Sequence, residues 1–182
     1  YLLTTELDPY NWTDFRPRRL AGEAPNNDRL YRNNGDGTFT NVSAEAGIQI
    51  EGYGLGLALC DLNNDHYPDL YIANDFLSND IIYINNGDGT FTVQIDNYWS
   101  HTSRNGMGID IQDINNDGHS DIMVLDMLPT SNARQKSMFG FFSYDKFQLG
   151  LASGYQPQYA RNTLQLNNGN GTFSEVGQLA GI

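Results

Sequence analysis

Two acidic nine-residue segments carry the residues best suited to chemistry. DLNNDHYPD occupies residues 61–69 and DINNDGHSD occupies residues 113–121. Acidic or amide side chains stand at the first, third, fifth and ninth positions of each segment. Like charges this close together raise the free energy unless a cation compensates them. Since Ca²⁺ takes six to eight oxygen ligands in a flexible geometry, the alternation predicts one calcium site in each segment.

The two predicted ligand sets follow one pattern. Positions 1, 3, 5 and 9 supply side-chain oxygens, and position 7 supplies its backbone carbonyl. The first set is Asp61, Asn63, Asp65, Tyr67 (carbonyl) and Asp69, and the second is Asp113, Asn115, Asp117, His119 (carbonyl) and Asp121. Each set would place three carboxylates around one divalent ion, so we expect two Ca²⁺ ions as the cofactors.

Other readings of these segments fit the spacing less well. An EF-hand needs a bidentate Glu at position 12, where this chain has Ile72 or Val124 inside apolar stretches. Zn²⁺ favours His and Cys, but His66 and His119 lie off the alternating ligand positions. Ordinary polar turns remain an alternative because Asn, Asp and Gly are common turn residues. Two copies in the same register favour calcium.

The sixth position distinguishes the two segments. Gly118 suits a left-handed backbone there, whereas His66 is less favourable in that conformation. Pro68 also restricts the residue before it to an extended backbone. We therefore predict that the 61–69 segment binds calcium more weakly than the 113–121 segment.

The elements that position these segments form a repeat. NNGDGTF occurs at 33–39 and at 85–91, and NNGNGTF follows at 167–173. The first two of these motifs start 52 residues apart, as do the two acidic segments. GLGLALCD at 54–61 also matches GMGIDIQD at 106–113. Internal repeats with a period of about 50 residues are typical of propeller blades.

Four short strands are predicted in the cleanest copy of the repeat. They cover residues 57–60, 70–73, 81–84 and 91–95, which are rich in leucine, β-branched and aromatic residues. The Asn-Gly-Asp-Gly turns supply the positive φ angles that tight hairpins need. Four strands per unit is the pattern of a β-propeller blade. The predicted fold class is therefore all-β, a β-propeller segment of about three four-stranded blades, the first incomplete.

The whole chain, 1–182, is predicted to be a single propeller segment with two partly helical insertions. Its expected parts are a partial blade at 1–48 with an insertion at 4–26, a blade at 49–100, and a blade at 101–182 with an insertion at 127–160. In the second insertion, Ser143 could cap a helix that starts at Tyr144 and ends near Gly154.

The unit GYGLGLALCDLNNDHYPDLYIAN resembles the FG-GAP/VCBS repeat of integrin α-subunit propellers and bacterial surface proteins. The NNGDGTF hairpins and the DMLP stretch at 126–129 are similar to VCBS proteins of the bacterial ASPIC/UnbV-associated type. The resemblance implies that the acidic loop joins the first two strands of a blade and holds Ca²⁺. It departs from the family pattern at His66, where a glycine is expected.

Composition excludes some partner classes. The chain has 22 acidic and 10 basic side chains and a formal net charge of -12, which argues against nucleic acid as a partner. Cys60 is the only cysteine, so no internal disulfide can form, and we expect it to be a structural residue in a strand. No apolar run approaches the length of a transmembrane helix. The chain opens at Tyr1 without Met or a signal-like segment, and we expect it to belong to a longer protein.

Aromatic residues in the insertions are the candidates for recognition, since aromatic side chains dominate protein interfaces and sugar platforms. The candidate partner-binding residues are Trp12, Phe15, Phe139, Phe141, Phe142, Tyr144, Phe147 and Tyr155. The alternative is that both insertions only pack against the blades.

The expected function is a calcium-binding propeller scaffold that binds a protein or glycan. The expected location is extracellular or at the cell surface, either associated with a bacterial outer membrane or secreted. No catalytic set is found, so no enzymatic activity is expected. One alternative is a calcium-dependent polysaccharide lyase or hydrolase, for which Arg104, Lys136 and Lys146 are candidate bases. Another is an architectural subunit of a larger surface complex.

Overall fold

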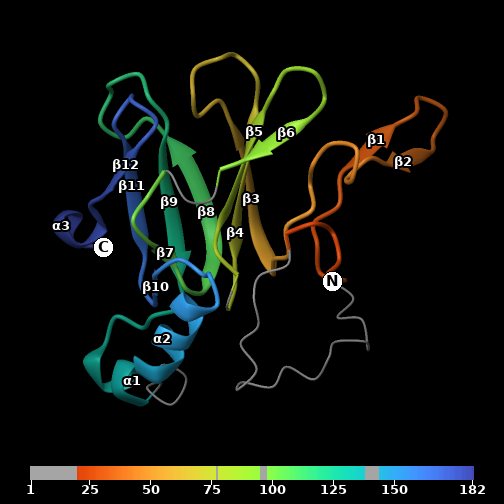
Figure 1. Ribbon diagram of the computed structural model, residues 1–182. Coiled ribbons are helices and arrows are strands. Elements are labelled where there is room, and N and C mark those ends of the chain that lie inside the picture. The colour runs from red at the N-terminus through yellow and green to blue at the C-terminus, as the bar shows by residue number, and fades with distance from the viewer. Residues whose placement is uncertain (1–19, 77, 95–97, 138–143) are drawn as a thin grey trace.

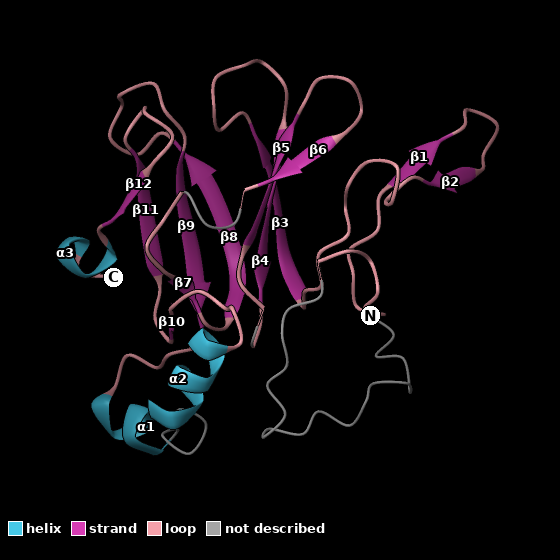
Figure 2. Cartoon of the chain, viewed as in Figure 1, coloured by secondary structure: helices cyan, strands magenta, loops and turns pink. Residues whose placement is uncertain are grey.

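Two four-stranded antiparallel sheets dominate the protein (Figures 1 and 2). The computed structural model describes residues 20–76, 78–94, 98–137 and 144–182. Sheet 1 has the strand order β3-β4-β5-β6, and sheet 2 has the order β8-β9-β11-β12. The predicted all-β class is confirmed, and the strands in the described ranges do not close into a barrel.

Both sheets repeat the same strand sequence. Sheet 1 consists of β3 (Gly54–Cys60), β4 (Asp69–Asn74), β5 (Ile81–Asn85) and β6 (Phe91–Val93). Sheet 2 consists of β8 (Gly106–Gln112), β9 (Asp121–Asp126), β11 (Thr163–Asn167) and β12 (Phe173–Glu175). Each strand predicted for the middle unit coincides with one strand of sheet 1. The structure adds a register shift between Gly54 and Gly56, repeated between Gly106 and Gly108, which the sequence pattern did not predict.

The remaining elements are short. The first repeat contributes a separate hairpin of β1 (Tyr31–Asn33) and β2 (Phe39–Asn41). A parallel pair joins β7 (Thr102–Ser103) to β10 (Gln158–Tyr159). The helices are α1 (Asn132–Ser137), α2 (Tyr144–Ala152) and α3 (Gly177–Ala180).

The NNGDG turns are stabilised by side-chain hydrogen bonds as well as by their glycine backbone conformation. Gly87 and Gly89 have φ angles of 77° and 90°, as predicted for this turn. Asp88 Oδ1 accepts hydrogen bonds from the backbone N–H and the hydroxyl of Thr90, at 3.0 and 2.6 Å. The turns after β1 and β11 repeat this arrangement. The turn sequence therefore fixes the hairpin locally.

The main core lies where the two sheets pack together. Tyr71, Ala73, Ile122 and Val124 are buried there, with Trp99 between Tyr71 and Phe173 at ring distances of 5.4 and 5.6 Å. β3 and β8 approach closely because Gly56 has no side chain. A Cβ at that position would lie 2.9 Å from Cγ2 of Ile109.

Sheet 1 is covered on its second face as well. Ile72, Ile81 and Tyr83 pack there against Ala46, Ile48 and Ile50. Burial on both faces explains why β4 and β5 read as continuous apolar runs rather than as alternating strands. This arrangement holds the ends of β3 and β4, and so the acidic loop between them, at a fixed separation.

The described part of the 127–160 insertion lies at the end of the sheets opposite the acidic loops (Figure 2). Helix α2 starts at Tyr144 and is followed by Gly154 with a φ angle of 88°, which confirms the predicted helix and its glycine stop. Ser143, the predicted cap, lies outside the described residues. The segment after α2 is hydrogen-bonded to Asn79. The backbone N–H of Gln156 and the side-chain Nε2 of Gln158 both donate to Asn79 Oδ1, at 3.1 Å each.

One fully buried carboxyl group lies beside this contact. Asp80 accepts hydrogen bonds from the hydroxyl of Tyr71 at 2.6 Å and from the backbone N–H of Asn74 at 2.9 Å. Burial raises the pKa of Asp80 to about 7, although these two hydrogen bonds act in the opposite direction.

Candidate functional site

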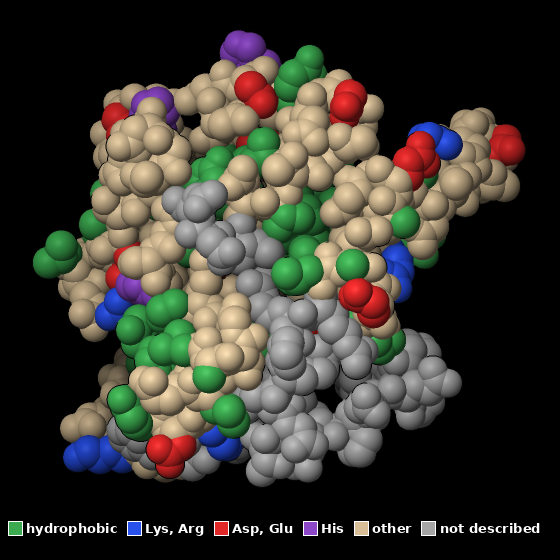
Figure 3. All heavy atoms as spheres, in the orientation of Figure 1, with side chains coloured by type: hydrophobic (Ala, Val, Ile, Leu, Met, Phe, Trp, Pro, Cys, Tyr) green, Lys and Arg blue, Asp and Glu red, His purple; other side chains and the backbone are tan. Residues whose placement is uncertain are grey.

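The two acidic loops join equivalent strands, β3 to β4 and β8 to β9, at the same end of the molecule (Figure 1). Acidic and histidine side chains are visible along this end in Figure 3. In the first loop, Asp61 accepts hydrogen bonds from the backbone N–H groups of Asp65 at 3.1 Å and His66 at 2.8 Å. Asn63 Oδ1 accepts from the N–H of Asp65, and Asp65 Oδ1 accepts from the N–H of Tyr67.

The second loop repeats each of these bonds. Asp113 accepts from the N–H groups of Asp117 at 3.1 Å and Gly118 at 2.9 Å. Asn115 Oδ1 accepts from the N–H of Asp117, and Asp117 Oδ1 accepts from the N–H of His119. The loops therefore share one fold, in which the side chains at positions 1, 3 and 5 turn inward over the loop backbone. Those are the positions predicted to bind metal.

The backbone at position 6 has the predicted left-handed conformation in both loops. Gly118 has a φ angle of 87°, and His66 has one of 72°. The backbone at position 4 is also left-handed in both loops, at Asn64 and Asn116. Asparagine tolerates the left-handed region better than most residues. Because a histidine is less stable than glycine at positive φ, the first loop carries a local energetic cost that the second loop lacks.

The ninth position anchors each loop to the sheet. Asp69 is fully buried and accepts hydrogen bonds from the N–H groups of Leu62 at 2.9 Å and Asn85 at 2.8 Å. Asp121 is equally buried and accepts from Ile114 and Asn167 at 2.9 Å each. Burial raises the pKa of Asp69, and the neighbouring carboxylates of Asp65 and Asp61 add to that rise. A cation near these groups would relieve this cost.

The side chain at position 7 has a role that sequence reasoning missed. A Cβ on Gly87 would lie 2.7 Å from the ring of Tyr67, and a Cβ on Gly169 would lie 2.5 Å from the ring of His119. The aromatic or imidazole ring of each loop thus packs on the glycine of its own NNG turn. The sequence does show that both acidic segments have a ring-bearing residue at position 7 and that both units have a glycine in the NNG turn. That shared pattern could have predicted the contact.

The two loops also contact each other. Asn64 Nδ2 lies 2.9 Å from Nδ1 of His119. The first loop also contacts sheet 2, because Asn167 Nδ2 at the end of β11 donates to the carbonyl of Leu62 at 3.2 Å. The loops are therefore parts of one continuous surface rather than independent turns.

The carboxylates are not gathered into a ready-made cluster. Within the described ranges, no group of three or more His, Cys, Asp or Glu side chains lies at metal-binding distances. Each predicted set also depends on an asparagine oxygen and a backbone carbonyl. Every carboxylate oxygen that accepts one N–H retains a second lone pair, so the donor set fits a hard cation such as Ca²⁺ if the loop contracts around it.

The predicted partner-binding aromatics fall into two groups. Trp12, Phe15, Phe139, Phe141 and Phe142 lie outside the described residues. Of the other three, Tyr144 is 75% exposed at the start of α2, Phe147 stacks on Tyr159 at 5.8 Å, and the hydroxyl of Tyr155 lies 3.5 Å from Glu51 Oε1. The contact of Tyr155 with Glu51, in the segment just before β3, supports the alternative that the insertion packs against the blades.

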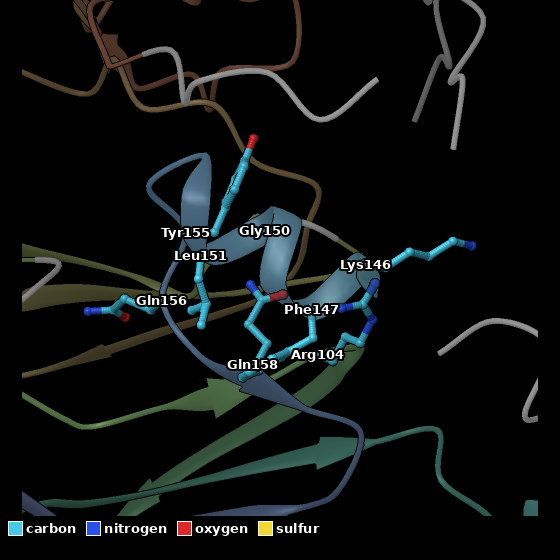
Figure 4. A pocket seen from close by; sticks show the side chains of 8 residues that line it. All are labelled: Arg104, Lys146, Phe147, Gly150, Leu151, Tyr155, Gln156 and Gln158. Carbon is cyan, nitrogen blue, oxygen red and sulfur yellow. The ribbon is translucent and has the colours of Figure 1, made fainter. Parts of the chain in front are cut away.

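A shallow hollow, open to solvent, lies beside α2 (Figure 4). Phe147 and Tyr155 line it, together with the candidate bases Arg104 and Lys146, while Lys136 is not among the lining residues. Figure 4 shows that the side chains of Lys146 and Tyr155 extend away from the hollow. The structure therefore brings four candidate residues near one another without converging them on one point.

A charged cluster next to the hollow was not found from the sequence. Arg161 Nη2 lies 2.8 Å from Glu175 Oε2 and 2.9 Å from His101 Nε2. His101 packs edge-on against Tyr159 at 4.9 Å, and burial lowers its pKa. Because the guanidinium donates to Nε2, that nitrogen is not free to act as a base. The cluster ties the end of the insertion to sheet 2.

Cys60 has no sign of reactivity. It lies half-buried at the end of β3, packs against the main core and is a free thiol. Burial raises its pKa to about 12, with smaller contributions from Asp69 and Asp61. A thiol in this state is protonated at neutral pH, in agreement with the predicted structural role.

The repeat seen in the structure corresponds to a known family. The sequence matches the FG-GAP-like repeat twice, over residues 20–72 and 61–124, which together span more than half of the chain. The chain belongs to the FG-GAP-like repeat family. The matches end at Ile72 and Val124, each the fourth residue of the strand that follows an acidic loop, so the matched residues include both loops. A search of curated proteins finds no significant match.

Proposed function

We propose that this FG-GAP chain is a calcium-stabilised scaffold that presents a binding surface on a secreted or cell-surface protein. The observation that supports calcium most is the identity of the two acidic loops. Both have the same hydrogen bonds to positions 1, 3, 5 and 9 and the same pair of left-handed residues. Ordinary turns do not require this agreement at every position.

In this proposal each loop holds one Ca²⁺ through the oxygens of positions 1, 3, 5 and 9 and the carbonyl of position 7. Three carboxylates per loop would otherwise repel one another, and burial of Asp69 at the ninth position of the first loop raises its pKa, which disfavours its charged form. Calcium supplies that positive charge and draws the exposed carboxylates together. The ion therefore fixes the connection between the first two strands of each sheet.

A binding role follows from the family and from the surface. FG-GAP repeats are generally non-enzymatic and typical of extracellular proteins, and no helix among the described residues is long and apolar enough to cross a membrane. We propose a protein or a glycan as the partner. The exposed ring of Tyr144 and the half-exposed ring of Phe147 on α2 are the described residues best suited to meet it.

The calcium proposal is tested by thermal unfolding with added CaCl₂ and with EGTA. Calcium at 100 times its Kd would stabilise the fold by about 3 kcal/mol for each occupied site. The Asp65→Ala and Asp117→Ala variants should each remove part of this gain, and the double variant should remove all of it. An unfolding temperature that is the same in calcium and in EGTA would contradict the proposal.

A further inference from the structure

The first acidic loop touches the second loop and its sheet through residues that alternate with its predicted ligands. These residues are Leu62 and Asn64, at positions 2 and 4, between the ligand positions 1, 3 and 5. Asn64 Nδ2 lies 2.9 Å from Nδ1 of His119 in the second loop. The carbonyl of Leu62 accepts a hydrogen bond from Asn167 Nδ2 at 3.2 Å. A movement of the ligands in the first loop therefore also moves groups that the second unit contacts.

His119 occupies a predicted ligand position of the second loop. Its carbonyl is the proposed ligand at position 7, and its backbone N–H donates to Asp117 Oδ1 at 2.9 Å. Its ring packs on Gly169 on one side and approaches the amide of Asn64 at Nδ1. The position of His119 is thus fixed by three contacts, and one of them belongs to the neighbouring loop.

Asn167 connects the anchoring carboxylates of the two loops. Its backbone N–H donates to Asp121 at 2.9 Å, while its side chain donates to the carbonyl of Leu62. The N–H of Leu62 in turn donates to Asp69 at 2.9 Å. Leu62 and Asn167 are both buried, so these hydrogen bonds are shielded from water. One hydrogen-bonded path therefore runs from the ninth position of the first loop to that of the second.

The equivalent residue in sheet 1 shows which part of this path joins the two units. Asn85 donates from Nδ2 to the carbonyl of Pro68 at 3.1 Å, just as Asn167 donates to the carbonyl of Ser120 at 3.3 Å. Of these two asparagines, Asn167 alone has a further bond to the loop of the other sheet within the described part of the chain. The pair Asn167 and Asn85 thus separates contacts between units from contacts within a unit.

We propose that the two loops bind calcium cooperatively, with Asn64 and Asn167 as the positioning residues that couple them. This inference rests on the proposed calcium sites. When the first loop contracts around an ion, the carbonyl of Leu62 and the amide of Asn64 become fixed. Their contacts then hold His119 and Asp121 in place for the second ion. By linkage, an ion in the second loop strengthens binding at the first by the same factor.

Charge repulsion between the two sites acts in the opposite direction. Each ligand set carries three carboxylates, so an ion in one loop lowers the negative potential that attracts an ion to the other. Salt screens this effect between exposed charges over about 8 Å at about 0.15 M ionic strength. The hydrogen bonds between buried groups are screened much less. Positive coupling should therefore prevail at physiological salt and weaken at low ionic strength.

The test is a calcium titration of the ¹⁵N-labelled, chelator-treated protein, followed at the backbone amides of His66 and Gly118, at position 6 of each loop. A coupling of about tenfold is within the usual range for linked sites and should give a Hill coefficient of about 1.4 at both amides. Removing the second site with Asp117→Ala should raise the calcium concentration at the His66 midpoint about fivefold. Independent sites would leave this midpoint unchanged.

Two pairs of variants separate coupling from local effects. Asn64 has a φ angle of 61°, which glycine adopts readily, so Asn64→Gly removes the contact with His119 and keeps the loop conformation. Its control is Asn116→Gly, with a φ angle of 60° and a side chain that makes no hydrogen bond to any residue that the structure describes. Asn64→Gly should lower the Hill coefficient, whereas Asn116→Gly should not. Asn167→Ala should likewise lower it, and Asn85→Ala should not.

The outcomes distinguish this coupling from the calcium sites themselves. Two bound ions without cooperativity in the unmodified protein would overturn the coupling and leave the calcium proposal intact. Equal loss of cooperativity in Asn64→Gly and Asn116→Gly would also overturn it, because the effect would then arise from loop flexibility. The absence of any calcium-dependent shift would refute the calcium sites, and the coupling with them.

Discussion

Replacing His66 by glycine should stabilise the protein and strengthen calcium binding at the first loop. His66 has a φ angle of 72°, and its side chain is 96% exposed, with only a 4.0 Å approach to Asp61. The substitution therefore removes left-handed strain and almost no contact. Strain of this kind costs about 1 kcal/mol in a residue with a Cβ, which corresponds to about a fivefold change in calcium affinity.

The second loop offers the matched control. Gly118 has a φ angle of 87° at the same position, and a Cβ there would meet nothing within 4 Å. Gly118→His should therefore lose about 1 kcal/mol without any steric clash. The assays are urea unfolding and calcium titration calorimetry of both variants. Destabilisation by His66→Gly, or no effect of Gly118→His, would refute the reasoning from backbone strain.

Three further outcomes are expected. Gly87→Ala should lower the free energy of unfolding by about 2 kcal/mol, since its Cβ would collide with the ring of Tyr67, whereas Gly89→Ala, with a similar φ and open space, should cost about 1 kcal/mol in the same urea assay. Asp80 has a folded-state pKa of about 7 against an unfolded value of 3.8, so its own contribution to stability is most favourable below about pH 4 and falls by about 4 kcal/mol as the pH rises to 7. Asp80→Asn should remove this contribution, and a pH profile of stability that is the same in Asp80→Asn and in the unmodified protein would contradict it. Asp121→Ala should cost about 3 kcal/mol even in EGTA, because it leaves the buried N–H of Asn167 and the partly buried N–H of Ile114 without an acceptor, and a loss seen only with calcium present would argue against this anchoring role.

The repeat made much of the fold predictable from the sequence. Strands β3 to β6 follow from apolar runs separated by turn residues, and the NNGDG motif identifies its hairpins through the need for positive φ. The left-handed backbone at position 6 of the acidic loops was also predictable. Gly118 indicates this conformation in the second loop, and His66 occupies the same position in the first.

Features that depend on contacts between repeats were not predictable. The packing of Tyr67 on Gly87 joins a loop to a turn 20 residues away, and neither residue looks unusual in its own segment. The Arg161–Glu175–His101 cluster joins parts of the chain up to 74 residues apart. The full burial of Asp69 likewise arises from the sheet around it, whereas the sequence shows only a loop carboxylate.

Calcium titration calorimetry on the chelator-treated protein tests the central claim most directly. Two acidic loops of the same conformation predict two calcium ions per chain, one lost in Asp65→Ala and the other in Asp117→Ala, with the remaining site of the Asp65→Ala variant the tighter of the two. The absence of calcium-dependent heat, or a stoichiometry that neither substitution changes, would contradict the claim that these loops are metal sites.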